Sequence, residues 1–229
     1  MEFQVGLENN VEGRSLAWVL GHPGCFAYGA NGVAALAAAQ AAIRDYMEWL
    51  DAHGEMWLAA DSIEIRHVET WDVYDIDDHY ERADQGYSVN AFFLHDWKPL
   101  TAEDMEQGMK VLAWSRADLL QTVSQLSLEK LDANYPGERW SIAGILRHVG
   151  GAEWWYLDRL GLAFPREDVP PEPFARLDTV RTSLLEVLPR LAGSQQVIGK
   201  DGEFWSPRKL LRRAAWHERD HIMHIQKLV

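Results

Sequence analysis

Residues 205–224 read WSPRKLLRRAAWHERDHIMH, and this stretch predicts the helix that completes a helical bundle. Ser206 is a favoured N-cap residue, and Pro207 suits the first helical position. Trp205 and Leu210 are spaced to pack against each other across that cap. We therefore expect a helix that runs from about residue 207 to the C-terminus.

The same kinds of signal predict three earlier helices. Thr101 stands three residues before Asp104, which marks one helix start, and Ser141 marks the next. Apolar residues at helical spacing between 174 and 191 mark a third helix. Four helices within residues 98–229 predict an all-α four-helix bundle.

Residues 1–97 predict a β-rich domain with one Ala-rich helix. Apolar and polar residues alternate over residues 3–7, and residues 15–20 read as the second strand of a hairpin. Asn31 is a suitable N-cap for a helix that ends near Asp51. The predicted fold class is therefore α+β, with one domain at 1–97 and a second at 98–229.

The net charge of −13 belongs entirely to the first predicted domain. Residues 1–97 hold four basic and 17 acidic side chains, whereas residues 98–229 hold 18 of each. Because such an acidic domain repels phosphate backbones, we expect no nucleic-acid binding. A basic partner protein for residues 1–97 is one interpretation, and a solvated acidic face that keeps the protein in solution is the other.

Cysteine usage and hydropathy indicate a cytoplasmic protein without a membrane span. Cys25 is the single cysteine, and the sequence does not begin with a basic segment followed by an apolar run. The longest apolar tract, residues 33–43, is about half as long as a membrane-spanning helix. We therefore expect neither secretion nor membrane association.

The histidines of the second predicted domain have the spacing of metal ligands. His217 and His221 are four residues apart, so their imidazoles share one helix face and can reach one ion at about 2.0–2.1 Å. His148, on another predicted helix, is the candidate third ligand. His224 is about 10.5 Å from His217 along the axis, so we expect it beside the site or in the core. We expect a divalent ion, zinc or nickel; the alternative is that the histidines are satisfied core residues.

The surroundings of these histidines leave two further interpretations open. Small residues near His148, among them Gly144 and Gly151, either leave space for an ion or ligand or allow close helix packing. Arg116 interrupts an apolar stripe, so it is either a buried group that faces the site or a side chain that snorkels at the stripe's edge.

Charged residues surround the last histidines in the sequence. Glu218 and Asp220 are expected to point away from the imidazoles, so we do not assign a zinc-peptidase function. The cations at the start of the helix either bind an anionic thiol or substrate, or form a solvated face. These cations are Arg208, Lys209, Arg212 and Arg213.

A first resemblance lies near the N-terminus. Glu12-Gly13, the strand at 15–20, Pro23-Gly24-Cys25 and the Ala-rich helix resemble the HicB antitoxin-type domain over about residues 3–50. This resemblance implies a small α+β fold used for protein contact.

A second resemblance covers about residues 100–229. The segments WSIAGILRH (140–148), with Ala152-Glu153, and RRAAWHERDH (212–221) are similar to those of the DinB/YfiT superfamily. The resemblance implies a four-helix bundle in which His148, His217 and His221 hold a divalent metal.

Some members of that superfamily use the metal to activate a low-molecular-weight thiol. The resemblance thus implies a metal- and thiol-dependent transferase acting on a small electrophilic substrate. The alternative function is a non-catalytic interaction protein whose acidic N-terminal domain binds a basic partner, with structural histidines.

Overall fold

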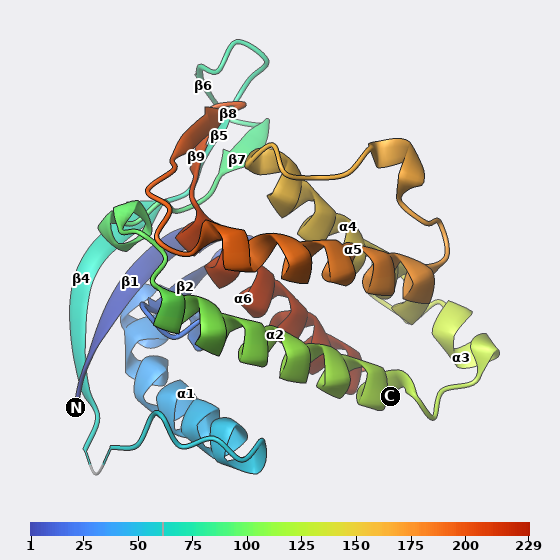
Figure 1. Cartoon of the computed structure of the whole chain (residues 1–229), viewed down its shortest axis with the longest axis horizontal. Coiled ribbons are helices and arrows are strands. Elements are labelled where there is room, and N and C mark those ends of the chain that lie inside the picture. Colours follow the sequence, from blue (N-terminus) through green and yellow to red (C-terminus); the bar gives the residue numbers. More distant parts are fainter. Residues whose placement is uncertain (61) are drawn as a thin grey trace. The chain divides into compact units, whose positions relative to one another are not determined.

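The N-terminal part of the computed structural model is a four-stranded sheet with the order β3-β2-β1-β4 (Figure 1). β1 and β2 pair antiparallel around a turn in which Glu12 and Gly13 have positive φ, which confirms the predicted hairpin. β4 joins the other edge of β1 in parallel. The strands are β1 (Glu2–Val11), β2 (Arg14–Val19), β3 (Phe26–Gly29) and β4 (Glu64–Asp72).

The Ala-rich helix α1 (Gly32–Ala52) packs on this sheet, mainly on β3 and β2. Its N-cap is Asn31, as predicted, whose side chain accepts a hydrogen bond from the Ala34 amide at 3.0 Å. Gly29 permits the close approach, because a Cβ there would lie 2.1 Å from the Ala35 nitrogen. The small residues of α1 therefore serve helix–sheet packing.

A second, three-stranded sheet has the order β6-β5-β7, and a separate hairpin joins β8 to β9. Glu203 of β9 accepts hydrogen bonds from the Tyr87 hydroxyl at 2.6 Å and the Asn90 amide at 3.2 Å. These strands are β5 (Tyr74–Ile76), β6 (Arg82–Ala83), β7 (Tyr87–Val89), β8 (Ile198–Lys200) and β9 (Glu203–Trp205), and a 3-10 helix covers Leu94–Trp97.

The structure describes residues 1–60 and 62–229, which form two units. The first unit is Met1–Lys98 with Val197–Trp205, and the second is Pro99–Gln196 with Ser206–Val229. This differs from the predicted division into 1–97 and 98–229, because the β8-β9 hairpin belongs to the first unit. The reason is the buried carboxylate of Glu203, whose hydrogen-bond donors lie in the first unit.

The second unit is the predicted four-helix bundle (Figure 1). Each of its four long helices begins with a side chain that caps the free backbone amides, from Thr101, Ser141, Glu172 and Ser206. The long helices are α2 (Ala102–Val123), α4 (Ile142–Arg159), α5 (Pro173–Val187) and α6 (Pro207–Gln226). Shorter segments are α3 (Leu128–Asp132) and the 3-10 helices Arg166–Asp168 and Leu188–Leu191.

The fold class is α+β, as predicted, with a β-rich first part and a helical second part. One core cluster of the bundle joins α2, α4, α5 and α6 through buried aliphatic side chains, among them Leu119, Leu146, Leu177 and Ile225. Within residues 1–60 and 62–229, we find no helix with the length and hydropathy that a bilayer crossing requires.

Candidate metal centre

Three imidazoles meet in the second unit. The Nε2 atom of His217 on α6 lies 3.0 Å from Nε2 of His148 on α4 and 3.1 Å from Nε2 of His221. One ring nitrogen from each of the three lies within 4.8 Å of the others. In the part of the chain that the structure describes, this is the one His, Cys, Asp and Glu cluster found with metal-binding spacing.

Local helix geometry brings His217 and His221 together, and the packing of two helices adds His148. His217 and His221 share one face of α6 because they are one turn apart. His148 comes from α4, which packs against α6. The structure therefore brings together the three histidines that the sequence singled out as ligands.

The nitrogen spacing fits a single ion. Two ligands at about 2.0–2.1 Å from a tetrahedral ion lie about 3.3–3.4 Å apart, a few tenths of an ångström more than the separations seen here. Imidazole nitrogens are ligands for zinc, nickel, copper and iron. The donor set and its spacing thus match a divalent metal of that group.

Burial keeps the imidazoles of His217 and His221 in the neutral form that binds metal. His217 and His221 are 7% and 9% exposed. Burial, together with the neighbouring imidazoles and Arg213, holds the pKa of His217 well below its usual value. Burial, followed by the charges of His148 and His224, lowers the pKa of His221 to about 3. At neutral pH both rings therefore offer a lone pair without first losing a proton.

Aromatic rings line this histidine cluster. Trp140 stacks on His148 with the ring centres 4.6 Å apart, and Tyr156 lies edge-on to His217 at 6.1 Å. A Cβ on Gly144 would lie 2.9 Å from the Trp140 Cβ. The glycine therefore allows Trp140 to cover His148, which favours close packing over the open space that the sequence left as an alternative.

A ring of four buried charges lies next to the cluster, with one member from each long helix. Arg116 of α2 and Arg181 of α5 each bind both carboxylates, Glu153 of α4 and Glu218 of α6. The four N···O distances are 3.3, 2.7, 2.7 and 2.8 Å. We name these four residues the charge ring. Arg116 is therefore buried and paired, not a snorkelling side chain, and its partners in the ring are non-local.

The contacts of Glu218 show whether its carboxylate could serve as the general base of a zinc peptidase. Residues 217–221 read HERDH, which matches the His-Glu-x-x-His string of zinc peptidases, although we expected Glu218 to point away from the imidazoles. The Glu218 carboxylate is 1% exposed and binds Arg116 and Arg181. Because both oxygens face the charge ring, the carboxylate is not placed to act as the general base of a peptidase.

His224 lies at the margin of the cluster. Its ring centre is 5.9 Å from that of His221, and its Nε2 contacts a Glu138 carboxylate oxygen at 2.7 Å. It is partly exposed and does not join the three converging nitrogens. This agrees with its expected place beside the site.

The cations of α6 are buried, which disagrees with a plain solvated face. Arg208 binds the Asp104 carboxylate and the Pro99 carbonyl, at 2.5 and 2.7 Å. The Arg213 guanidinium lies 4.4 Å from the ring centre of Trp216. Arg213 itself is about one helical turn before His217 on α6. Arg213 is thus the cation of this group closest in the helix to His217 and His221.

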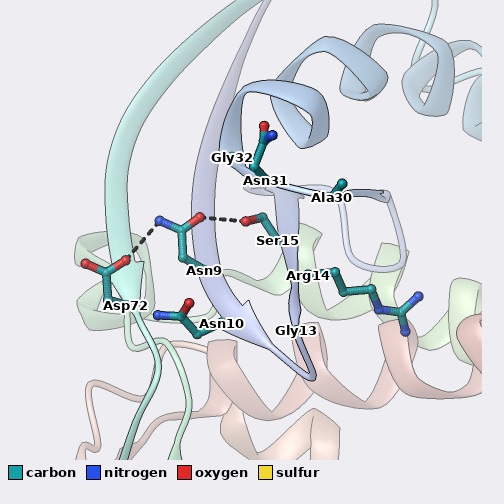
Figure 2. A pocket seen from close by; sticks show the side chains of 9 residues that line it. All are labelled: Asn9, Asn10, Gly13, Arg14, Ser15, Ala30, Asn31, Gly32 and Asp72. Carbon is teal, nitrogen blue, oxygen red and sulfur yellow. Dashed lines mark hydrogen bonds between the residues drawn. The ribbon is translucent and has the colours of Figure 1, made fainter.

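The first unit carries a separate polar pocket of about 340 Å³, shown in Figure 2. Asn9 donates to Asp72 at 2.9 Å and accepts from Ser15 at 2.8 Å. The nine lining residues include one carboxylate and no imidazole or thiol, so this pocket lacks a donor set comparable to that of the bundle. None of the predicted site residues lines it.

Part of the bundle matches the model of a known protein family. Residues 112–225 match the family model described as DinB superfamily. A solved structure, "Crystal structure of TT2238, a four-helix bundle protein", is similar at 25% identity, covering 54% of this chain and 98% of that chain with a TM-score of 0.44. No curated protein was found to match the chain. The family match lies outside residues 3–50, so the resemblance of that segment to HicB stays a prediction.

Proposed function

We propose that the DinB superfamily domain of this chain binds one divalent metal ion through His148, His217 and His221. The observation that carries this proposal is the approach of three imidazole nitrogens, from two helices, to 3.0 and 3.1 Å, with His217 and His221 buried and His148 partly buried. Unbound imidazoles packed this tightly leave lone pairs facing each other unless a proton or an ion lies between them. Zinc or nickel fits this donor set, and we expect zinc first on availability.

We further propose that the metal centre serves a thiol-dependent transferase. A bound divalent ion supplies Lewis acidity, which lowers the pKa of a thiol toward the thiolate. In such a reaction a sulfur–carbon bond forms on a small electrophilic substrate, the leaving group departs with its electron pair, and the thiol proton passes to solvent. The substrate class is therefore a small molecule with an electrophilic carbon.

The chain's own residues would bind and orient the reactants. Trp140 and Tyr156 supply an apolar border at His148 and His217, which limits the access of water. The positive charge of Arg213, one turn from His217, supports a thiol or substrate that carries a negative charge. Arg213 would orient this anion and take no part in bond breaking.

Metal analysis of the purified protein tests the metal site. After reconstitution with zinc or nickel, we expect about one ion per chain in the wild type and loss of that ion in His148→Ala, His217→Ala and His221→Ala. His224→Ala is the matched control, because it removes a histidine of the same helix outside the cluster and should keep the ion. A wild type that stays metal-free while folded would overturn the proposal and favour the interaction protein whose acidic domain binds a basic partner.

Thiol-dependent consumption of a halogenated nitroarene tests the chemistry. We expect turnover that requires both the metal and an added low-molecular-weight thiol. Arg213→Met should raise KM for an anionic thiol more than for a neutral one while metal content is unchanged. If the protein is fully occupied by metal but shows no thiol-dependent turnover on a panel of electrophiles, the transferase proposal is rejected. The metal-binding proposal would still stand.

A further inference from the structure

Residues 112–218 contain an internal sequence repeat with an offset of 65 residues. Gly137-Glu138-Arg139-Trp140-Ser141 recurs as Gly202-Glu203-Phe204-Trp205-Ser206. The glycine of each copy has a positive φ, and the serine of each copy caps the helix that follows, α4 or α6. The preceding helices, α2 and α5, repeat with the same offset, as shown by the pairs Leu112 and Leu177, Arg116 and Arg181, and Leu119 and Leu184.

The charge ring is made of equivalent residues from the two copies. Arg116 and Arg181 are 65 positions apart, and so are Glu153 and Glu218. The Nε of each arginine binds the glutamate of the other copy, at 2.7 Å in both cases. Each arginine also donates through Nη1 to a carbonyl of the other copy: Arg116 to Leu177, and Arg181 to Leu112. The ring therefore joins one helix pair to the other with approximate two-fold symmetry.

The energetic cost of burying charges indicates that the main role of the charge ring is not to stabilise the fold. All four side chains are buried, with exposures of 9, 3, 5 and 1% for Arg116, Glu153, Arg181 and Glu218. Desolvating such charges costs several kcal/mol per ion, and replacing a buried ion cluster by apolar side chains is often neutral or stabilising by about 1–4 kcal/mol. Unlike these ion pairs, apolar side chains make no directional bonds that would fix the register of one helix against another. A slip of one residue moves a helix by about 1.5 Å and turns it by about 100°, which would break the ring.

The metal ligands depend on the alignment that the ring specifies. His148 belongs to one copy, while His217 and His221 belong to the other; their equivalents are Arg213, Ala152 and Tyr156. Glu218 follows His217 directly on α6, and Glu153 follows His148 by five residues, about 7.5 Å along α4. Each glutamate therefore lies within about one and a half turns of the ligand on its own helix.

We propose that the charge ring is a positioning device for the metal centre: Arg116 and Arg181 bridge Glu153 to Glu218 and thereby hold α4 and α6 in the register at which the three imidazoles converge. This inference rests on the proposed metal site. It assigns to these four residues no contact with the ion or the substrate. Loss of a group that hydrogen-bonds a metal ligand costs about 10–100-fold in metal affinity, and we expect a register change that moves the ligands themselves to cost at least the lower figure.

The test replaces the whole ring by apolar side chains in the full chain, as Arg116→Met, Glu153→Leu, Arg181→Met and Glu218→Leu. We expect the metal-free variant to fold with a thermal midpoint at least equal to that of the wild type, because no unpaired charge remains. Its zinc affinity, measured by competition with a chromophoric chelator, should fall at least tenfold. The absorption spectrum of the cobalt-loaded protein should change as well, since it reports ligand geometry.

Two milder variants and one control complete the design. Glu153→Gln and Glu218→Gln keep the shape of the ring and should lose affinity to a smaller degree. Asp104→Asn removes the ion pair with Arg208, which also joins α2 to α6 but lies outside the ring, and should leave zinc affinity unchanged.

The outcomes separate the two proposals. A wild type that binds no metal rejects the metal site and this inference with it. A folded four-fold variant with wild-type zinc affinity rejects only the inference and leaves the metal site standing. An unfolded four-fold variant would also contradict the inference, because the ring would then be required for stability and not for alignment alone.

Discussion

His148 and His217 are 69 positions apart in the sequence and lie on different helices, yet their Nε2 atoms are 3.0 Å apart. Two neutral imidazoles can share one proton at that distance, but His221 adds a third nitrogen 3.1 Å from His217. All three are held by helices whose ends are capped and whose apolar faces are packed. The cluster is therefore preorganised, which favours an ion that binds without a large rearrangement of the bundle.

Metal binding should stabilise the second unit by mass action. A ligand present at 100 times its Kd stabilises the folded state by about 2.7 kcal/mol. We expect the thermal midpoint of the wild type to rise with zinc concentration and to return to its starting value after a chelator is added. His148→Ala should show no such rise, whereas His224→Ala should behave as the wild type. A zinc-dependent rise that persists in His148→Ala would place the bound ion elsewhere.

The stability of the metal-free protein should fall in mild acid. In the unfolded chain His217 and His221 take up protons near pH 6.5, whereas in the folded chain their pKa values are lowered, that of His221 to about 3. Between pH 6.5 and these lowered pKa values, the unfolded state thus binds more protons than the folded state. The free energy of unfolding should decline as pH falls from about 6.5 toward 3, by up to about 1.4 kcal/mol per pH unit for each group.

This pH dependence can be measured by urea unfolding in the presence of a chelator. His221→Leu removes one of the titrating groups and should give a shallower decline than the wild type over the same interval. His67→Leu, which makes the same substitution at an exposed histidine of the first unit, is the matched control. Equal slopes in all three proteins would contradict the neutral, buried state of His221.

Sequence patterns predicted what is local in this structure. Capping residues predicted the starts of α2, α4 and α6, and the four-residue spacing of His217 and His221 predicted one side of the histidine cluster. His148 was the candidate third ligand as a histidine of another predicted helix, and the resemblance to a known superfamily implied the same residue. Each of these features depends on residues close in the sequence or on a motif.

Non-local pairing was not predictable from the same patterns. Arg116 and Glu218 are 102 positions apart, and nothing near Arg116 in the sequence indicates its partner. Likewise, the strands at 198–205 show no local sign that they belong to the first unit. The 65-residue repeat was, however, present in the sequence, and matching Arg116 with Arg181 and Glu153 with Glu218 would have indicated a buried cluster.

Removing one arginine of the charge ring should be far more damaging than removing all four charges. Arg116→Met leaves Glu153 and Glu218 buried with a single arginine between them, and breaking a buried pair in this way costs about 3–5 kcal/mol. Urea unfolding should show this loss. Asp104→Asn leaves Arg208 the Pro99 carbonyl and an amide oxygen as acceptors, and should cost less than Arg116→Met. If Arg116→Met and the four-fold apolar variant proved equally stable, the charges would not be coupled as the structure shows.

Two glycines of the bundle should respond in opposite directions to the same substitution. A Cβ on Gly108 of α2 would lie 2.4 Å from Leu211 Cδ2 of α6, so Gly108→Ala should force the two helices apart and cost about 1–3 kcal/mol. A Cβ on Gly151 of α4 would meet only an Arg176 nitrogen at 3.7 Å. Gly151→Ala should therefore stabilise the protein by about 0.5–1 kcal/mol through helix propensity. Urea unfolding of both variants checks this, and a stabilising Gly108→Ala would show that α2 and α6 pack less closely than the structure places them.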